Sequence, residues 1–378
     1  MNDAPLVSIN CVTYNHVNFI RDALAGFVMQ QTTFPFEVLV HDDASTDGTA
    51  EIICEYERQY PHQVLPIYQQ ENQYSKRVPI TASIQLPRAR GKYIASCEGD
   101  DYWTDPYKLQ KQVDFLEGHP ECSMCFHNVE VQYQDRQSAP ESFCSSDQKP
   151  ISTLEDLLIM NFIPTASLMF RLEAFQGLPE WYFERPMDWP FFILIAQHGD
   201  IGYIDEVMAI YRMHAGGVWW WRDPLAKIKV TLPMYAHFYR HLGTAYADII
   251  RTGASKAIAA GAAATYAAAD TDGLASSLDF VQTTLDAATD AGYATPAFRR
   301  VTKAMSYEAL GFVAYQKRNM RIARHCYTRA LALDPTIARN KGVLSLWFEA
   351  CFGEKASTIR RNLGARLRVY LRRGRSLG

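Results

Sequence analysis

The sequence lacks the features that mark a membrane-spanning, secreted or nucleic-acid-binding protein. No stretch reaches the roughly 18 uninterrupted apolar residues that a spanning helix needs. The start, MNDAPLVSIN, has neither the basic residues nor the long apolar core of a signal peptide. A formal net charge of -3 argues against nucleic acid as the main partner, because backbone binding needs a broad positive surface. We therefore expect a cytoplasmic protein.

Two common phosphate-binding motifs are also absent. The chain has no Walker loop and no GxGxxG. A bound diphosphate would therefore need a metal ion to neutralise its charge.

A structural zinc site is not favoured either. Cys122 and Cys125 form a CxxC with His127 close behind, but a structural site needs four ligands and there is no second CxxC. We interpret CSMCFHNVEV as a buried strand, and we expect the eight cysteines of a cytoplasmic chain to be reduced.

Length and patterning predict two domains, the first of them α/β. The chain has 378 residues, 48% of them hydrophobic and 21% charged, as is ordinary for soluble globular protein. Leu6 to Val12 and Phe36 to Val40 read as buried strands, and each is followed by a polar turn and an amphipathic helix. This alternation is typical of a parallel sheet with helices on its faces.

Three polar turns follow predicted strands of this sheet. They are Thr13 to Asn15, Asp42 and Asp43, and the run EGDDYW from Glu98 to Trp103. Ligands of open α/β sheets bind beyond the carboxyl ends of the strands, so the turns should converge on one crevice. Glu98, Asp100 and Asp101 would suit Mg²⁺ or Mn²⁺, which prefer oxygen ligands. Taken alone, the acidic run is equally well explained as a solvated turn.

Several ordered motifs resemble those of bacterial family-two glycosyltransferases, which have the GT-A fold. They are VSINCVTYN, VLVHDDASTDGT and GKYIASCEGDDYWTDPYKLQKQ, and the resemblance covers roughly residues 5 to 215. It implies a Rossmann-like, mixed but mostly parallel sheet and a nucleoside-diphosphate sugar as donor, with a UDP-sugar favoured. Asp43 would hydrogen-bond the base or ribose. The family usually has aspartate where Glu98 stands.

The resemblance also assigns residues to the donor and to a divalent metal, Mn²⁺ or Mg²⁺. The predicted donor-binding residues are Thr13, Tyr14, Asn15, Asp43, Asp100 and Arg212, and the predicted metal ligands are Asp101, Asp100, Glu98 and His214.

Asp188, in the run RPMDWPFF, is the predicted catalytic base. In the resembled family an acidic pair at this point supplies the base, and here Met187 replaces its first member. An inverting transfer needs one carboxylate to take the acceptor proton. The alternative is that Asp188 caps the following helix.

Aromatic residues are the candidates for acceptor binding. Three adjacent indoles, Trp219 to Trp221, cannot all be buried on one face, so at least one should stack on a sugar or contact another subunit. The predicted acceptor contacts are Trp219, Trp220 and, with a weaker claim, His127.

Beyond residue 222 the chain changes character. We expect a GT-A domain at 1–222, a connecting helix at 223–244, an all-α domain at 245–355 and a basic tail at 356–378. Helix breaks are predicted near 270–273, 292–296 and Asp334-Pro335. One tetratricopeptide-like unit is carried by Tyr307, Leu310, Gly311, Ala314, Ala323, Tyr327, Ala330 and Pro335. Such a module binds a peptide or another subunit, a homodimer included, or else only covers the enzyme domain.

The tail has seven arginines and no acid, which suits an anionic membrane surface; a solvated tail is the alternative.

The sequence thus predicts a metal-dependent inverting glycosyltransferase of surface-glycan assembly, peripheral on the cytoplasmic face of the inner membrane. Its acceptor would be a glycan, a lipid-linked acceptor or a polypeptide. Two alternatives remain: glycosyl transfer to a polypeptide, and a non-catalytic scaffold.

Overall fold

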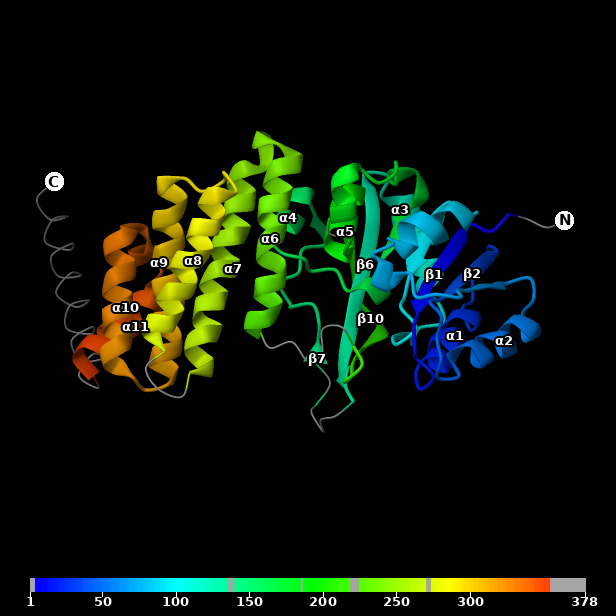
Figure 1. Ribbon diagram of the computed structural model, residues 1–378, viewed down its shortest axis with the longest axis horizontal. Helices are drawn as coiled ribbons and strands as arrows, with labels where there is room; N and C mark the ends of the chain where they lie inside the picture. The colour runs from blue at the N-terminus through cyan, green and yellow to red at the C-terminus, as the bar shows by residue number, and fades with distance from the viewer. Residues whose placement is uncertain are drawn as a thin grey trace, which may run out of the picture. The chain divides into compact units, whose positions relative to one another are not determined.

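The structure is a computed structural model that describes residues 4–134, 139, 141–184, 186–217, 224–269 and 273–353. The chain divides into two compact units, Met1–Trp221 and Arg222–Gly378. The first is built on a sheet and the second on helices (Figure 1).

The first unit contains one mixed sheet with the strand order β3-β2-β1-β4-β9-β6-β10-β5, with β7 beside β6 and β8 beside β10. The strands are β1 (Val7–Thr13), β2 (Phe36–Asp42), β3 (Val64–Tyr68), β4 (Tyr93–Ser96), β5 (Tyr102–Trp103), β6 (Cys122–Tyr133), β7 (Glu141–Ser142), β8 (Ile151–Ser152), β9 (Met169–Arg171) and β10 (Asp200–Met213). The helices are α1 (Ile20–Val28), α2 (Thr49–Gln59), α3 (Lys108–Gly118), α4 (Leu154–Ile159) and α5 (Asp188–Ala196).

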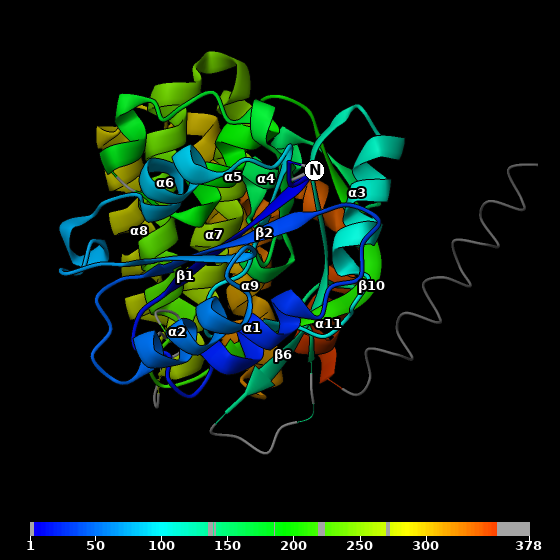
Figure 2. The ribbon, with the colours of Figure 1, turned by 90° about the vertical axis from the view of Figure 1, so that its right-hand side faces the viewer.

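The amino-terminal half of this sheet is parallel, as predicted. β1 pairs in parallel with both β2 and β4, and β2 pairs in parallel with β3. Alternate β1 residues Val7, Ile9 and Cys11 are fully buried, and so is Ser8 between them, because covered parallel strands are buried on both faces. Helices α1 and α2 lie side by side (Figure 2). The α/β prediction is confirmed.

The second half of the sheet is mixed. β9 pairs antiparallel with both β4 and β6, whereas β6 and β10 pair in parallel over their length, with register shifts at Asp200/Ile201 and between Ile204 and Ala209. The short strand β5 pairs antiparallel with β10, where Tyr102 faces Ile210. The residues that follow β4 are thereby fixed against the end of β10.

Trp103 anchors this region in the core. Its Nε1 donates to the Ala166 carbonyl at 2.8 Å, and its ring packs edge-on against Phe27. A Cβ on Gly26 would lie 2.9 Å from the Trp103 carbonyl oxygen, so a side chain there would push α1 away from β5. Trp103 is therefore a packing residue beneath the acidic turn.

Lys108 is fully buried beside Trp103. Its Nζ lies 3.8 Å from the centroid of the indole ring and donates to Gln112 Oε1 at 2.6 Å. Burial lowers the pKa of Lys108 from 10.5 to about 7, since a charged ammonium loses its hydration there.

Replacing Lys108 by Met should therefore change how stability depends on pH. Between about pH 7 and 10.5 the unfolded wild type holds a proton that the folded protein has lost, so raising the pH favours the folded state. The wild type should gain up to about 1.4 kcal/mol per pH unit relative to Lys108→Met in urea unfolding. Lys111→Met on the same helix is the control. If the free energy of unfolding changed with pH equally in the wild type and in Lys108→Met, the lowered pKa of Lys108 would be contradicted.

The second unit consists of helices packed side by side (Figure 1). They are α6 (Pro224–Leu242), α7 (Ala247–Ala268), α8 (Leu274–Asp290), α9 (Pro296–Gln316), α10 (Met320–Leu333) and α11 (Lys341–Phe352). The predicted breaks near 292–296 and at Asp334-Pro335 coincide with the ends of these helices, whereas most of the predicted break at 270–273 lies outside the described residues. In the α9–α10 pair a Cβ on Gly311 would come within 2.9 Å of the Tyr327 ring, so the glycine allows close packing.

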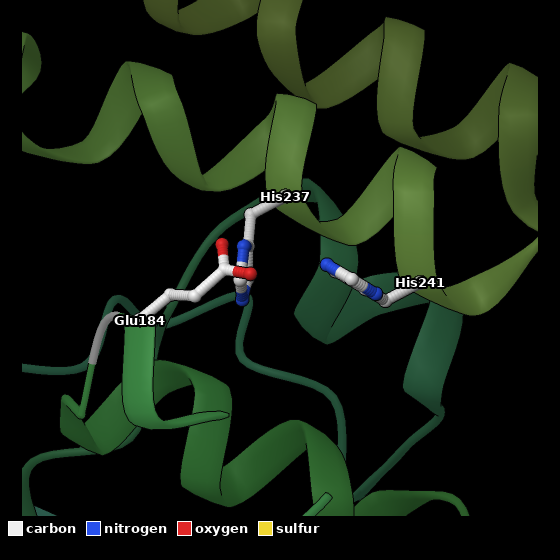
Figure 3. A group of neighbouring side chains, drawn as sticks. All are labelled: Glu184, His237 and His241. Carbon is white, nitrogen blue, oxygen red and sulfur yellow. The ribbon is translucent and has the colours of Figure 1, made fainter. Parts of the chain in front are cut away.

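Two histidines lie one turn apart on α6. The ring centroids of His237 and His241 are 4.7 Å apart (Figure 3).

All eight cysteines of the chain are free thiols, and Cys122 and Cys125 are buried in β6. In the described part of the chain, every helix is too short or too polar to span a bilayer.

Candidate active site

The three predicted turns meet at the end of β1. The amide of Asp43, after β2, donates to the Thr13 carbonyl at 2.9 Å. The amide of Gly99, after β4, donates to the Val12 carbonyl at 3.0 Å. Parallel pairing of β1 with both neighbours brings the carboxyl ends of all three strands to one edge, as expected.

Gly99 allows the acidic turn to approach β1. A Cβ at this position would lie 2.4 Å from Thr13 Oγ1 and 3.0 Å from the Ile20 side chain. Both distances are shorter than van der Waals contact, so a larger residue would displace the carboxylates on either side. Steric crowding therefore explains why the EGDD run has a glycine at position 99.

Glu98, Asp100 and Asp101 form a cluster that fits a divalent cation. Each offers a carboxylate oxygen, and these oxygens all lie within 4.8 Å of one another. Among the described residues, Asp100 Oδ1 and Asp101 Oδ2 are buried and have no hydrogen-bond partner. Buried carboxylate oxygens without partners are costly, and a hard cation would satisfy them. The residues present therefore fit Mg²⁺ or Mn²⁺.

Two histidines flank Asp100. His214 Nε2 lies 3.2 Å from Asp100 Oδ2, and His16 Nε2 lies 3.7 Å from the same oxygen. Burial acts to raise the pKa of Asp100, but the hydrogen bond to His214 and the charge of His16 lower it overall. The structure thus brings the predicted ligand His214 to the cluster. His16 was not predicted, although it stands in the turn after β1.

Arg212 holds the acidic turn in place. Its amide donates to Asp101 Oδ1 at 2.8 Å, its Nη1 donates to the Asp100 carbonyl at 3.1 Å, and its Nη2 donates to Asp22 of α1. The guanidinium carbon lies 4.2 Å from the Tyr102 ring centroid and 5.4 Å from that of Phe19. The side chain predicted to contact phosphate is thus engaged with the turn and with α1.

Replacing Arg212 by Met should weaken Mn²⁺ binding. Loss of a group that hydrogen-bonds to a metal ligand lowers metal affinity by about 10-fold to 100-fold, and Arg212 donates hydrogen bonds to both Asp100 and Asp101. The affinity would be measured by Mn²⁺ titration in the presence of UDP. Arg90→Met, which removes an arginine paired with buried Glu37, is the matched control and should leave the affinity unchanged. Equal Mn²⁺ affinity in Arg212→Met and wild type would refute this role.

Glu98 interacts electrostatically with Asp188 as well as with Asp100 and Asp101. Burial raises the pKa of Glu98 well above its usual value, and the charges of Asp188, Asp100 and Asp101 raise it further. Burial by surrounding atoms also raises the pKa of Asp188, although Thr165 Oγ1 donates to Asp188 Oδ2 at 3.3 Å. Asp188 is the first residue of α5, whose N-cap is Met187 with no side-chain cap bond. Asp188 therefore stands one residue inside the N-cap position of the helix.

The predicted nucleoside residues lie at the end of β1 and in the turns after β1 and β2. Tyr14 is 44% exposed, and Asn15 links two turns, because its Oδ1 accepts from the Thr46 amide at 2.9 Å. Asp43 is buried, and its two carboxylate oxygens accept from the amides of Gln73 at 2.7 Å and Tyr74 at 3.0 Å. Asp43 therefore orders the loop after β3.

Asp42 is an additional candidate. Its Oδ2 lies 3.4 Å from the Ser45 amide, and its Oδ1 is buried without a partner among the described residues. Burial raises the pKa of Asp42. The adjacent acids Asp42 and Asp43 in the sequence indicated a binding site, but the strand pattern did not indicate which of the two keeps an unpaired oxygen.

Of the predicted acceptor residues, His127 is the one that the described part of the chain contains. His127 is fully buried in β6, where its Nδ1 lies 2.7 Å from the Asn128 carbonyl and burial lowers its pKa well below the usual value. A buried neutral imidazole is a core group in this conformation. Trp219 and Trp220 lie outside the described residues.

Residues 8–178 match the family model described as Glycosyl transferase family 2. They are a family 2 glycosyltransferase domain. The glycosyltransferase motifs of the sequence analysis, from Thr13 to Asp101, fall inside this match, whereas Asp188, Arg212 and His214 follow it.

Relatives of this glycosyltransferase domain include an uncharacterized protein of Mycobacterium tuberculosis H37Rv, 43% identical over 216 residues, which cover 56% of this chain and 60% of the relative. The chain therefore spans less than two thirds of that protein's length. The UDP-Glc:alpha-D-GlcNAc-diphosphoundecaprenol beta-1,3-glucosyltransferase WfaP of Escherichia coli is 33% identical over 112 residues, 30% of this chain and 41% of that protein.

Two solved structures share the fold of this chain. TarS residues 1–349 of S. aureus in complex with UDP has a TM-score of 0.53 at 15% identity, and the match covers 89% of this chain and 92% of TarS 1–349. Mannosyltransferase PcManGT of Pyrobaculum calidifontis with GDP-Man and Mn²⁺ has a TM-score of 0.52 at 18% identity, with 90% and 89% covered. These likenesses confirm the GT-A fold.

Proposed function

We propose that this protein is a metal-dependent inverting glycosyltransferase that moves a sugar from a nucleoside-diphosphate sugar to a hydroxyl group. The observation that carries the proposal is the cluster of Glu98, Asp100 and Asp101, with unpaired carboxylate oxygens, at the same sheet edge as the nucleoside turns. The complexes of TarS with UDP and of PcManGT with GDP-Man and Mn²⁺ support a nucleotide and a cation.

Glu98, Asp100, Asp101 and His214 would hold the cation. A bound divalent cation stabilises the negative charge that develops on a departing diphosphate. Arg212 keeps Asp100 and Asp101 oriented, and Thr13, Tyr14, Asn15 and Asp43 form the nucleoside side. A UDP-sugar is our first choice of donor.

Asp188 would take the proton of the acceptor hydroxyl as that oxygen attacks the anomeric carbon. Inversion follows because the acceptor attacks opposite the leaving diphosphate. A raised pKa makes Asp188 a better base than an ordinary carboxylate, since proton affinity rises with pKa. Thr165 would orient the carboxylate through its hydroxyl.

The acceptor we propose is a lipid-linked glycan of surface-glycan assembly, handled at the cytoplasmic face of the membrane. The name of WfaP, which acts on a diphosphoundecaprenol glycan, supports this choice. The basic residues 356–378, which would contact the membrane, lie outside the described residues, and membrane contact stays a prediction.

A thermal-shift screen of UDP- and GDP-sugars with and without Mn²⁺ tests the proposal. A ligand that binds only the folded state raises the melting temperature by mass action. We expect one sugar nucleotide to stabilise the protein, and to do so more strongly with Mn²⁺. If no nucleotide changes the melting temperature under either condition, the chain is better explained as a non-catalytic scaffold.

A further inference from the structure

Helix α10 of the second unit carries a stripe of basic residues on its exposed face. Between Glu308 and Asp334 the sequence has five basic residues and no acid. Three of them, Arg321, Arg324 and Arg329, are exposed on α10 together with His325. Their spacing of three, four and eight residues places them on one side of the helix.

This stripe borders a cavity of about 540 Å³. Its walls come from three helices and contain no acidic residue: Leu274 of α8, Arg321, Ile322, Arg324, His325, Thr328 and Arg329 of α10, and Cys351 of α11. The volume lies in the range of roughly 300–1,000 Å³ that ligand sites occupy. The cavity has an apolar part, from Leu274, Ile322 and Cys351, and a basic rim.

Among the residues that the structure describes, no acidic side chain forms an ion pair with the three arginines. In residues 224–269 and 273–353, none of Arg321, Arg324 and Arg329 takes part in an ion pair. By contrast, Arg251 pairs with Asp248, and Arg299 pairs with Asp286 in the same unit. Thr328 is held by Trp347, whose Nε1 donates to its hydroxyl at 3.1 Å, so α11 fixes one wall. The positive potential of this face is therefore available to a partner.

The spacing of the charges indicates the shape of that partner. From Arg321 to Arg329 the helix rises about 12 Å, with His325 at the midpoint. Alternate residues of an extended chain are about 7 Å apart, close to the roughly 6 Å between successive basic positions. An extended acidic segment would match all of them, whereas a single phosphate would reach only part of the stripe. The arginine-rich residues 356–378 have the wrong charge to fill this cavity.

We propose that this cavity, the α10 basic groove, binds an acidic polypeptide segment. Carboxylates of the segment pair with Arg321, Arg324 and Arg329, because guanidinium groups bind carboxylates with two parallel hydrogen bonds. Apolar side chains of the segment contact Leu274, Ile322 and Cys351. The proposal does not depend on glycosyl transfer by the first unit.

Fluorescence anisotropy with the full chain and a labelled peptide of alternating glutamate and leucine tests this groove. Binding should weaken as salt is added, and a peptide with glutamine in place of glutamate should bind at least ten-fold more weakly. The variant Arg321→Gln, Arg324→Gln, Arg329→Gln should lose at least ten-fold in affinity. The control variant Lys256→Gln, Arg300→Gln, Lys341→Gln makes the same charge change outside the groove and should bind as the wild type does.

Each other outcome overturns the proposal. If both triple variants lost the same peptide affinity, the peptide would be attracted by net charge alone. If the groove variant bound the peptide as tightly as the wild type, the three arginines would not form the binding site. Binding to vesicles of anionic lipid that requires the three arginines, without peptide binding, would assign the groove to a membrane surface instead. Unchanged melting temperatures show that the variants are folded.

Discussion

Asp188→Asn should lower the rate of sugar transfer by about 10²-fold to 10⁴-fold, the usual contribution of a general base. An amide has the same shape as the carboxylate but cannot take a proton from the acceptor hydroxyl. Because Asp188 is not one of the clustered carboxylates, nucleotide and Mn²⁺ affinities should stay within about two-fold of wild type. The rate would be measured as nucleoside diphosphate released from the stabilising donor in the presence of a polyprenyl-diphosphate glycan.

The exposed acid Glu173, also in the first unit, provides a matched control. Glu173→Gln makes the same chemical change and should keep full activity. Thr165→Val removes the hydroxyl that donates to Asp188 and should have an intermediate effect. A full rate in Asp188→Asn would show that another group is the base. A parallel loss of donor affinity would instead assign Asp188 to binding.

Asp101→Asn should weaken the binding of Mn²⁺ and of the sugar nucleotide together, each by on the order of 100-fold or more, because loss of a group that only hydrogen-bonds to a metal ligand already lowers metal affinity by about 10-fold to 100-fold. Asp101 has one oxygen fixed by the Arg212 amide and the other unpaired, so the substitution puts an amide group where a cation would lie. Calorimetric titration of UDP at several Mn²⁺ concentrations would separate the two affinities. Without Mn²⁺, variant and wild type should bind UDP equally weakly.

Asp105→Asn is the control for this substitution. Asp105 lies four residues further along the chain and pairs with Lys111 instead of joining the cluster. It should not change the Mn²⁺ dependence. If Asp101→Asn bound UDP with the same Mn²⁺ dependence as the wild type, the cation would have to be held by other residues, with Glu98 and Asp100 as the next to test.

The sequence predicted the parts of this site that depend on local patterns. Buried apolar runs predicted strand ends at Val12, Val40 and Cys97, each within two residues of the end in the structure, so the turns could be placed at one edge before any coordinates were known. Parallel strands with covered faces leave few other arrangements. The same logic placed Asp188 at the start of a helix.

Contacts between distant segments could not be predicted in this way. Arg212 pairs with Asp22, which lies 190 residues earlier in the chain, and a local sequence pattern cannot predict a contact over such a separation. Asp43 accepts amides from a loop, 72–74, that has no periodicity. The full burial of His127 could not be predicted either, because a histidine in a strand gives no sign of which face is buried until the neighbouring strands are known.

The long-range tie of Arg212 also has a consequence for folding. Asp100 and Asp101 are bound by a residue that follows them by 112 and 111 positions, at the end of β10. Contacts of such high sequence separation form late, because loop-closure entropy must be overcome first. A nascent chain that has emerged only to α3 should therefore carry the whole acidic turn and still bind Mn²⁺ poorly. We expect cation affinity to appear only once β10 has joined the sheet, which would keep partly synthesised chains from sequestering metal or donor.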